Sequence, residues 1–286
     1  MTQRPTRLCP PVAKKLFCAT ICVLSLFVSP TLQANKLQLE GNLIQGGLVR
    51  GLTDPNASVR FGDRSVRVST DGVFLIGFGR DAALRTQLVV SYPDGSSDHR
   101  IVEIEKRQYN VQKIDGLPPS KVTPSEEDLV RIRTEIELVK KTRQRDDPRT
   151  DFLSGFQWPL TGRISGVYGS QRILNGEPRR PHYGVDIAAP TGTVVVAPAD
   201  GVVSLSHPDM FYSGGTLILD HGHGLSSTFI HLHKALVTEG QKVKQGEPIA
   251  EVGATGRATG AHLDWRINLL EQRLDPQILV GPMPSG

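Results

Sequence analysis

The sequence predicts a mostly β protein, with an N-terminal β-sandwich, a helical linker and a C-terminal antiparallel β domain. Apolar and polar residues alternate with period two in many short runs after residue 35, as in half-buried strands. Turn formers are abundant, with 29 Gly and 20 Pro in 286 residues. No helical period occurs between residues 155 and 270. With 38% hydrophobic and 22% charged residues, the composition excludes a fully disordered chain and a polytopic membrane protein.

The first 34 residues have the three-part pattern of a secretory signal. Residues 1–15 are basic, residues 16–28 are apolar, and Leu32 and Ala34 suit the −3 and −1 positions of a cleavage site. The apolar run of about 13 residues is shorter than the roughly 20 that a permanent anchor helix needs. We therefore expect a signal peptide at 1–34, cleavage near Ala34, no stable membrane anchor afterwards, and export to a periplasm.

The excess of positive charge and the cysteines both lie in this predicted signal. Four of the 33 basic residues and no acidic residue are found there: Arg4, Arg7, Lys14 and Lys15. The other 29 basic residues balance 29 acidic ones, so the net charge of +4 does not indicate nucleic-acid binding. The three cysteines are Cys9, Cys18 and Cys22. The rest of the chain therefore has neither a thiolate zinc site nor a disulfide framework.

Residues 35–115 are predicted to form the β-sandwich. Alternating runs such as RSVRVSTDG and RIVEIEKR are separated by turn residues, with Asp-Gly pairs at 71–72 and 94–95. His99 is the only histidine of this region. We therefore expect no catalytic cluster here, and the domain could cover a site elsewhere, dock a partner or act as a spacer.

Residues 116–150 are predicted to form a hinge and a linker helix. The proline-rich stretch DGLPPSKVTP precedes a helix over 124–145, which we expect to begin at a capping box of Thr123 to Glu126 with Pro124 at the first helical position. One face of this helix is apolar: Leu129, Ile132, Ile136 and Val139. The helix would link the domains or pack on one of them. It is as good a candidate as the β-sandwich for the element that covers a site elsewhere in the chain.

The C-terminal domain, residues 151–286, holds seven of the eight histidines. Three segments carry metal-ligating residue types: HYGVD at 182–186, FIHLH at 229–233 and HLDW at 262–265. Residues i and i+2 of a strand share a face, so His262 would lie beside Asp264, and His231 could lie beside His233. Imidazole and carboxylate groups are the usual zinc ligands where thiolates are absent, and a catalytic zinc site needs three protein ligands.

His182, Asp186 and one side chain of the last segment would supply these three ligands. Each segment alone is a weak signal, because solvated strand faces also collect histidines. Their joint occurrence in one glycine-rich β domain favours a metal site. The remaining histidines are expected to be turn or surface residues: His99, His207, His221 and His223.

Residues 156–280 resemble the zinc metallopeptidases of the LytM, or lysostaphin-like, family (peptidase family M23). The matching stretches are PHYGVDIAAPTGTVVVAPADGVV at 181–203, GGTLILDHGHGLSSTFIHL at 214–232 and the run at 240–276 that contains GAHLDWRINLLEQRLDP. The resemblance implies a compact antiparallel β domain with an open groove and one Zn²⁺ per chain. It also implies cleavage of peptide bonds within peptidoglycan.

By position, the resemblance implies that His182 and Asp186 are zinc ligands and that His231 and His262 are catalytic residues that do not bind the metal. The third family ligand is a second histidine, and here Asp264 takes its place. Aspartate is a competent zinc ligand. Two carboxylates would cancel the charge of a divalent ion, so we expect a less acidic bound water and an activity profile shifted to alkaline pH.

The same resemblance places His233 outside the site. The basic loop at 170–181 would form one wall of the groove, with a tight turn at Asn175-Gly176. Three arginines of this loop would face stem-peptide carboxylates or solvent: Arg172, Arg179 and Arg180.

Two functions remain open from the sequence. The first is an exported zinc endopeptidase that cuts peptidoglycan stem peptides during cell-wall remodelling. The alternative is a catalytically inactive LytM-type module that binds and regulates a separate cell-wall amidase. As a further partner of the chain we consider a periplasmic regulatory protein. Degenerate modules lose several site residues, whereas here four of the five family positions are intact. A sugar-binding protein is disfavoured, because Trp158 and Trp265 are the only tryptophans.

Overall fold

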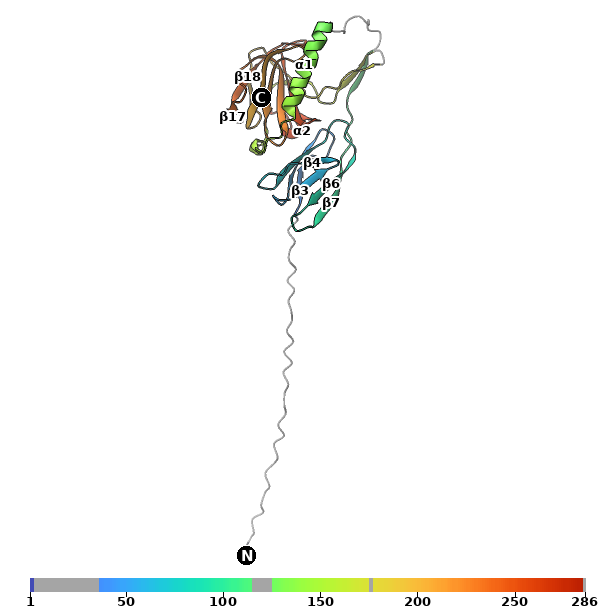
Figure 1. Ribbon diagram of the computed structural model, residues 1–286, viewed down its shortest axis with the longest axis vertical. Coiled ribbons are helices and arrows are strands. Elements are labelled where there is room, and N and C mark those ends of the chain that lie inside the picture. Colours follow the sequence, from blue (N-terminus) through green and yellow to red (C-terminus); the bar gives the residue numbers. More distant parts are fainter. Residues whose placement is uncertain (3–35, 115–124, 175–176, 285–286) are drawn as a thin grey trace. The chain divides into compact units, whose positions relative to one another are not determined.

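The structure is a computed structural model that describes residues 1–2, 36–114, 125–174 and 177–284 (Figure 1). It is mostly β, with two α-helices among its described residues, as the sequence predicts. Nearly all of the expected signal peptide, the whole hinge stretch DGLPPSKVTP at 115–124 and the Asn175-Gly176 turn lie outside the described residues. No helix in the described ranges is both long and apolar enough to span a membrane.

The N-terminal region is a two-sheet sandwich. One sheet has the order β1-β2-β5 and the other β4-β3-β6-β7. Their bounds are β1 Gln38–Gly41, β2 Leu48–Leu52, β3 Ser58–Phe61, β4 Arg64–Val66, β5 Val73–Gly77, β6 Arg85–Ser91 and β7 Ser97–Glu103. Strand β5 is buried along its whole length. Phe74 and Ile76 lie in the core of the sandwich, whereas Val73 and Leu75 belong to the core of the C-terminal domain.

The C-terminal domain is built on one ten-stranded sheet. Its main path has the order β17-β14-β15-β16-β19-β12-β9, with β13, β18 and β20 paired at its sides. The bounds are β9 Arg163–Gly166, β12 Val185–Ala188, β13 Val194–Val196, β14 Gly201–Met210, β15 Gly214–Asp220, β16 Leu225–Ala235, β17 Lys242–Val243, β18 Pro248–Val252, β19 His262–Leu269 and β20 Gln272–Leu274. Two short helices flank it, the 3₁₀ helix η2 Asp151–Ser154 and α2 Pro276–Val280.

The two faces of this sheet differ in chemistry. On β19, Leu263, Trp265 and Ile267 are fully buried in the hydrophobic core. Side chains alternate across a strand, so Asp264 and Arg266 lie on the opposite face. We call this opposite face of β12, β19, β16 and β15 the site face.

The linker helix α1 (Glu126–Arg143) packs on the site face. Val139 contacts an apolar cluster that includes Ile218 of β15, and Arg143 Nη2 donates a hydrogen bond to Thr228 Oγ1 of β16 at 3.0 Å. Ile218 and Thr228 are directly opposite in the strand register, so they share that face. The helix lies alongside the C-terminal strands in Figure 1.

Two details of this helix differ from the sequence expectation. The N-cap is Ser125, whose side chain accepts from the Asp128 backbone N–H, while Asp128 closes the capping box. The expected cap at Thr123 was therefore wrong, because Ser125 with an acid three residues later makes the same reciprocal bonds. Ile136, expected on the packed face, is 53% exposed. Glu135 faces inward instead and accepts from the Phe211 backbone N–H at 2.8 Å.

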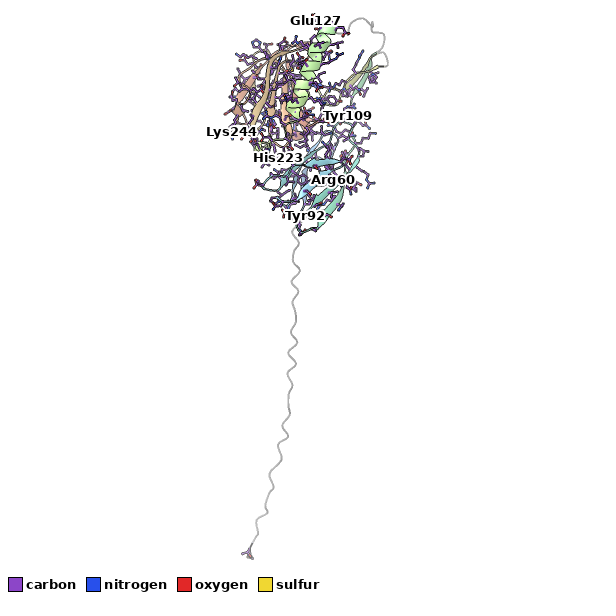
Figure 2. The ribbon with its side chains drawn as sticks, in the orientation of Figure 1. Arg60, Tyr92, Tyr109, Glu127, His223 and Lys244 are labelled. Carbon is purple, nitrogen blue, oxygen red and sulfur yellow. The ribbon has the colours of Figure 1, made fainter. Side chains whose placement is uncertain are left out.

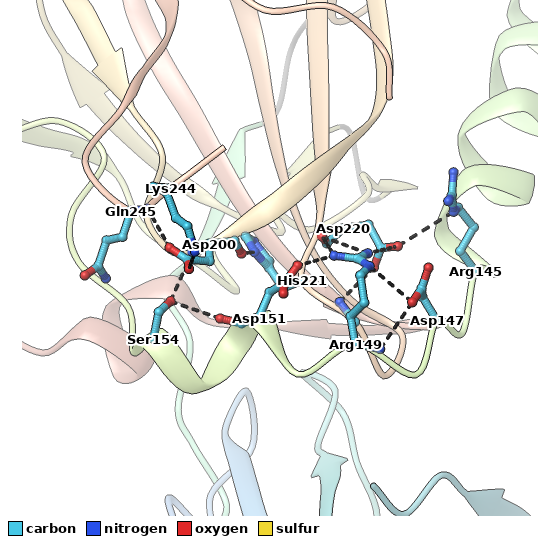
Figure 3. Close-up of polar contacts among 11 residues, drawn as sticks. Arg145, Asp147, Arg149, Asp151, Ser154, Asp200, Asp220, His221, Lys244 and Gln245 are labelled. Atoms are coloured by element: carbon cyan, nitrogen blue, oxygen red, sulfur yellow. Dashed lines mark hydrogen bonds and ion pairs between the residues drawn. The ribbon is translucent and has the colours of Figure 1, made fainter. Parts of the chain in front are cut away.

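The segment after α1 is fixed to the sheet by ion pairs. Arg149 contacts three carboxylates, those of Asp147, Asp151 and Asp220 (Figure 3). Asp220 ends β15 and is almost fully buried. This network anchors the connection between α1 and the first strands of the C-terminal domain.

The N-terminal region is also tied to the loop before the first expected zinc ligand. Strand β8 (Val111–Ile114) pairs in parallel with β10 (Gln171–Leu174), which pairs with β11 (Glu177–Pro178). The expected loop at 170–181 thus contains two short strands. Arg107 forms an ion pair with the buried Asp275 at 2.7 Å. Tyr109, labelled in Figure 2, packs edge-on against Tyr168.

Candidate metal centre

Two neighbouring strands bring the expected ligands together. In the antiparallel pairing of β12 with β19, Asp186 lies directly opposite Asp264. His182 precedes β12. One potential ligand atom from each of His182, Asp186 and Asp264 lies within 4.8 Å of the others. The structure therefore places at one point the three residues that the sequence singles out as ligands.

Two atoms of this trio are buried without a hydrogen-bond partner in the described part of the chain: His182 Nε2 and Asp186 Oδ1. They are 3.3 Å apart. Burial lowers the pKa of His182, which favours the neutral imidazole that binds metals. Burial, together with the negative charge of Asp264, raises the pKa of Asp186. A divalent cation would satisfy both orphaned atoms and stabilise the Asp186 carboxylate, so these residues fit a metal site.

The third expected ligand has a partner that the sequence analysis missed. Arg266 donates to both oxygens of Asp264, from Nε to Oδ1 at 2.9 Å and from Nη2 to Oδ2 at 2.5 Å. Burial acts to raise the pKa of Asp264, but the charge and hydrogen bonds of Arg266 outweigh it and hold that pKa below its ordinary value. The Asp264–Arg266 pair has a net charge of zero, the same as a neutral imidazole. Strand alternation alone could have indicated it, since Arg266 is two residues after Asp264.

The two expected catalytic histidines flank this trio. The rings of His231 and His262 have centroids 4.8 Å apart, and His262 Nε2 is 3.9 Å from Asp186 Oδ1. His231 Nδ1 donates to the Thr255 carbonyl and His262 Nδ1 to the Gly260 carbonyl, each at 2.8 Å. A carbonyl can only accept, so Nδ1 carries the proton and Nε2 is left as the basic atom of both rings. Burial lowers the pKa of His231 and favours its neutral form.

An irregular backbone aims His231 at the site. Its φ is +64°, unusual for a residue other than glycine, and the register of β16 against β15 shifts beside it. The His231 backbone N–H donates to the Ser213 carbonyl at 2.8 Å, which holds this conformation. The bulge breaks strict alternation, so His231 is buried while His233 is exposed. A pairing of these two histidines on one face was therefore wrong, because it assumed a regular strand.

Two glycines make room for the site carboxylates. Gly166 of β9 lies opposite Asp186, and a Cβ on it would be 2.1 Å from Asp186 Oδ2. At Gly184, a Cβ would be 2.5 Å from Asp264 Oδ1 and 2.6 Å from Arg266 Cγ. Side chains at either position would displace the carboxylates.

Two of the histidines expected to be turn or surface residues are buried instead. His221 and His223 do lie between β15 and β16, yet they are 0% and 5% exposed. His221 bridges the Asp200 carbonyl and Ser227 Oγ at 2.6 and 2.8 Å (Figure 3). The expectation of a surface position was wrong because this turn is covered by η2, where Phe152 packs edge-on against His223. His99 is exposed, on β7, and His207 is half-buried, on β14.

The five site residues lie in a stretch of the chain that matches a protein-family model. Residues 180–276 match the sequence model of "Peptidase family M23". A crystal structure described as a peptidase M23 from Pseudomonas aeruginosa is 28% identical, with a TM-score of 0.67. The match covers 84% of this chain and 96% of that one, so the similarity includes more than the C-terminal domain.

Curated relatives share the C-terminal part of the chain. Peptidoglycan DD-endopeptidase ShyA of Vibrio cholerae is 40% identical over 37% of this chain and 24% of its own length. DD-carboxypeptidase/endopeptidase Mpg of Neisseria meningitidis is 36% identical over 43% of this chain and 28% of its own length. The matched region spans about a quarter of the length of these relatives.

Proposed function

Since residues 180–276 form a peptidase family M23 domain, we propose that this chain is an exported zinc metalloendopeptidase that hydrolyses peptide cross-links in peptidoglycan. The observation that carries the proposal is the convergence of His182, Asp186 and Asp264 beside His231 and His262. Relatives named as peptidoglycan endopeptidases support the substrate class. A signal at 1–34 would deliver the enzyme to the periplasm, where that substrate lies.

His182, Asp186 and Asp264 would hold the zinc, which when bound polarises a scissile carbonyl and activates water. The pairing of Asp264 with Arg266 offsets one carboxylate charge. Asp186 is then the only ligand whose negative charge the protein leaves unbalanced, so the site would remain cationic.

His231 and His262 would handle the proton and the developing negative charge. Each presents a basic Nε2, because Nδ1 is committed to a backbone carbonyl. One ring would take a proton from the attacking water at Nε2. The other, once protonated there, would donate a hydrogen bond to the oxyanion. Both assignments are compatible with the 4.8 Å ring separation.

One observation favours the second candidate, a catalytically inactive module that regulates a cell-wall amidase. Both oxygens of Asp264 already accept hydrogen bonds from Arg266, so the ion pair could stand in for a metal at this position. The orphaned His182 Nε2 and Asp186 Oδ1 weigh against this, because Arg266 is not hydrogen-bonded to either of them. The enzyme therefore remains the better-supported function.

The test is release of muropeptides from purified sacculi by the wild-type chain and Asp264→Ala, each with and without a chelator. We expect release by the wild type alone, abolished by the chelator and restored by zinc. Absence of release by the metal-loaded wild type would overturn the enzyme proposal and favour the regulatory module. Release by Asp264→Ala at the wild-type rate would show that Asp264 is not a ligand.

A further inference from the structure

Beyond Arg266, the site face carries buried polar groups that the proposed chemistry does not use. Ser226 of β16 lies directly opposite Asn268 of β19. These residues are only 5% and 2% exposed. Within the described ranges, neither Ser226 Oγ nor Asn268 Oδ1 has a hydrogen-bond partner. Leaving such groups unpaired is costly, which indicates that something else contacts them.

Two half-buried arginines adjoin this pair. Arg273 of β20 lies directly opposite Asn268. Arg143, at the end of α1, is hydrogen-bonded to Thr228, two residues along β16 from Ser226, and its buried Nε has no partner among the described groups. No described carboxylate forms an ion pair with either arginine. We call Arg143, Arg273, Ser226 and Asn268 the anion site.

The charges of these arginines are not balanced locally. Burial and then the charge of Arg273 lower the pKa of Arg143 to about 9. Burial and then the charges of Arg180 and Arg266 lower the pKa of Arg273 to about 10. Both guanidinium groups stay protonated at neutral pH, so they repel each other in a partly desolvated place. A bound anion would relieve that repulsion.

An aromatic ring connects the anion site to the metal centre. Tyr183 directly follows His182, and the guanidinium carbons of Arg273 and Arg180 lie 5.0 and 5.7 Å from its ring centroid. Along β19, Asn268 is four residues after Asp264, which corresponds to about 13 Å in a strand. An extended peptide covers that distance in about four residues.

From this geometry we propose that the anion site binds a free carboxylate of the peptide substrate, a few residues from the bond that is cut; this rests on the proposed function. Two guanidinium forks donate to carboxylate oxygens, the Ser226 hydroxyl donates to them, and Asn268 can present its amide N–H₂ by rotation. This carboxylate is either the C-terminal carboxylate of the substrate stem peptide or the carboxylate of one of its acidic side chains. Helix α1 then supplies part of the substrate site through Arg143.

The test is calorimetric binding of a synthetic stem pentapeptide to the full chain, with a chelator present to prevent cleavage. The free-acid peptide is compared with two versions, one amidated at the C-terminus and one amidated at its side-chain carboxylates. We expect one of the two amidations to weaken binding by about tenfold or more, and that version identifies the carboxylate. Equal binding of all three peptides by the wild type would overturn the proposal.

Variants connect the preference to these residues. Arg143→Gln and Arg273→Gln should each lose about tenfold in affinity for the free acid and little for the amidated peptide. Asn268→Asp changes shape least and supplies a carboxylate of its own, so it should abolish the preference even if an arginine variant folds poorly. Arg131→Gln is the matched control and should retain it, because Arg131 of α1 pairs with Asp209 of β14 and with no member of the anion site. A preference that survives in Arg273→Gln and Asn268→Asp would refute the assignment.

Binding and cleavage can fail separately. Selective binding of the free-acid peptide, without metal-dependent release of muropeptides from sacculi, would support the anion site and overturn the endopeptidase proposal. Metal-dependent release of muropeptides, with equal binding of the free-acid and amidated peptides, would support the endopeptidase and overturn the anion site.

Discussion

Arg266 binds both carboxylate oxygens of Asp264, the residue two positions before it on β19. Asp264 takes the position at which the family that this chain resembles has a histidine. Its negative charge is balanced by the guanidinium group of Arg266, on the same face of β19. The alkaline shift expected from two carboxylate ligands should therefore be smaller than their number suggests. In the double variant Asp264→His/Arg266→Gln, which replaces the neutral pair by neutral side chains, the acidic limb of the pH profile should move only slightly. Asp264→His alone leaves the charge of Arg266 unpaired, so there the acidic limb should move to lower pH.

Arg266→Gln should weaken zinc binding. Without the guanidinium, burial raises the pKa of Asp264, so protons compete with the metal more strongly as the pH falls. We expect a loss of about 10–100-fold in zinc affinity near pH 7, larger at pH 6 than at pH 8. Competition titration with a chromophoric chelator measures this. Arg163→Gln, an exposed arginine on β9, is the control, and equal affinities for both variants would contradict a role for Arg266.

Gly166→Ala should displace Asp186. The added methyl group would lie 2.1 Å from Asp186 Oδ2, far inside contact distance. We expect zinc affinity to fall by about tenfold or more while the far-UV spectrum is unchanged. Gly260→Ala is the matched control, since its Cβ would meet no atom within 4 Å and its carbonyl is retained. Wild-type zinc content in both variants would show that the site tolerates the methyl group.

The roles of the histidines and of the ligands should separate in kinetics. His231→Gln should lower kcat by about 10²–10⁴-fold with zinc content unchanged, because it removes the basic Nε2 and no ligand. Asp186→Asn should lower zinc content and activity together. Metal analysis of the purified variants distinguishes the two cases. Loss of zinc from His231→Gln would move that residue into the ligand set.

His221 should make the fold sensitive to acid. Burial lowers its pKa from 6.5 to about 4, so the unfolded chain takes up the proton first as the pH falls. Its contribution is fully present above pH 6.5 and is lost between pH 6.5 and pH 4, a change of about 3 kcal/mol in unfolding free energy. Urea unfolding at pH 8 and pH 4 should show this extra loss in the wild type and in His99→Gln. His221→Gln should lack it.

The sequence predicted what depends on periodicity. Alternation identified the sandwich and the β domain, and it placed His262 and Asp264 on one face. The regular alternation of β12 and β19 is enforced by buried neighbours such as Val185, Leu263 and Trp265. Where the alternation along a strand is regular, the sequence predicts which of its side chains share a face.

Features that depend on contacts between distant segments were not predictable in this way. His231 is turned by a bulge whose hydrogen bond goes to Ser213, eighteen residues earlier. His221 is buried because η2 and its preceding segment cover the turn. Ile136 has the apolar character of a packed residue, yet Glu135 takes the inward position because the Phe211 N–H needs an acceptor. In each case the decisive partner lies in a different element.

The pairing of β8 with β10 has a consequence for the covalent chain. Residues 111–114 and 171–174 pair as neighbouring parallel strands. The part of the chain between them, which contains α1, therefore begins and ends at the same place in the fold. A protease site introduced between Ile114 and Ser125 would break the backbone and leave two fragments joined by that ladder, the Arg107–Asp275 ion pair and the shared core at Val73. The nicked protein should elute as one species in size-exclusion chromatography and separate only on denaturation. Covalent continuity at this point would then be dispensable to the assembled fold.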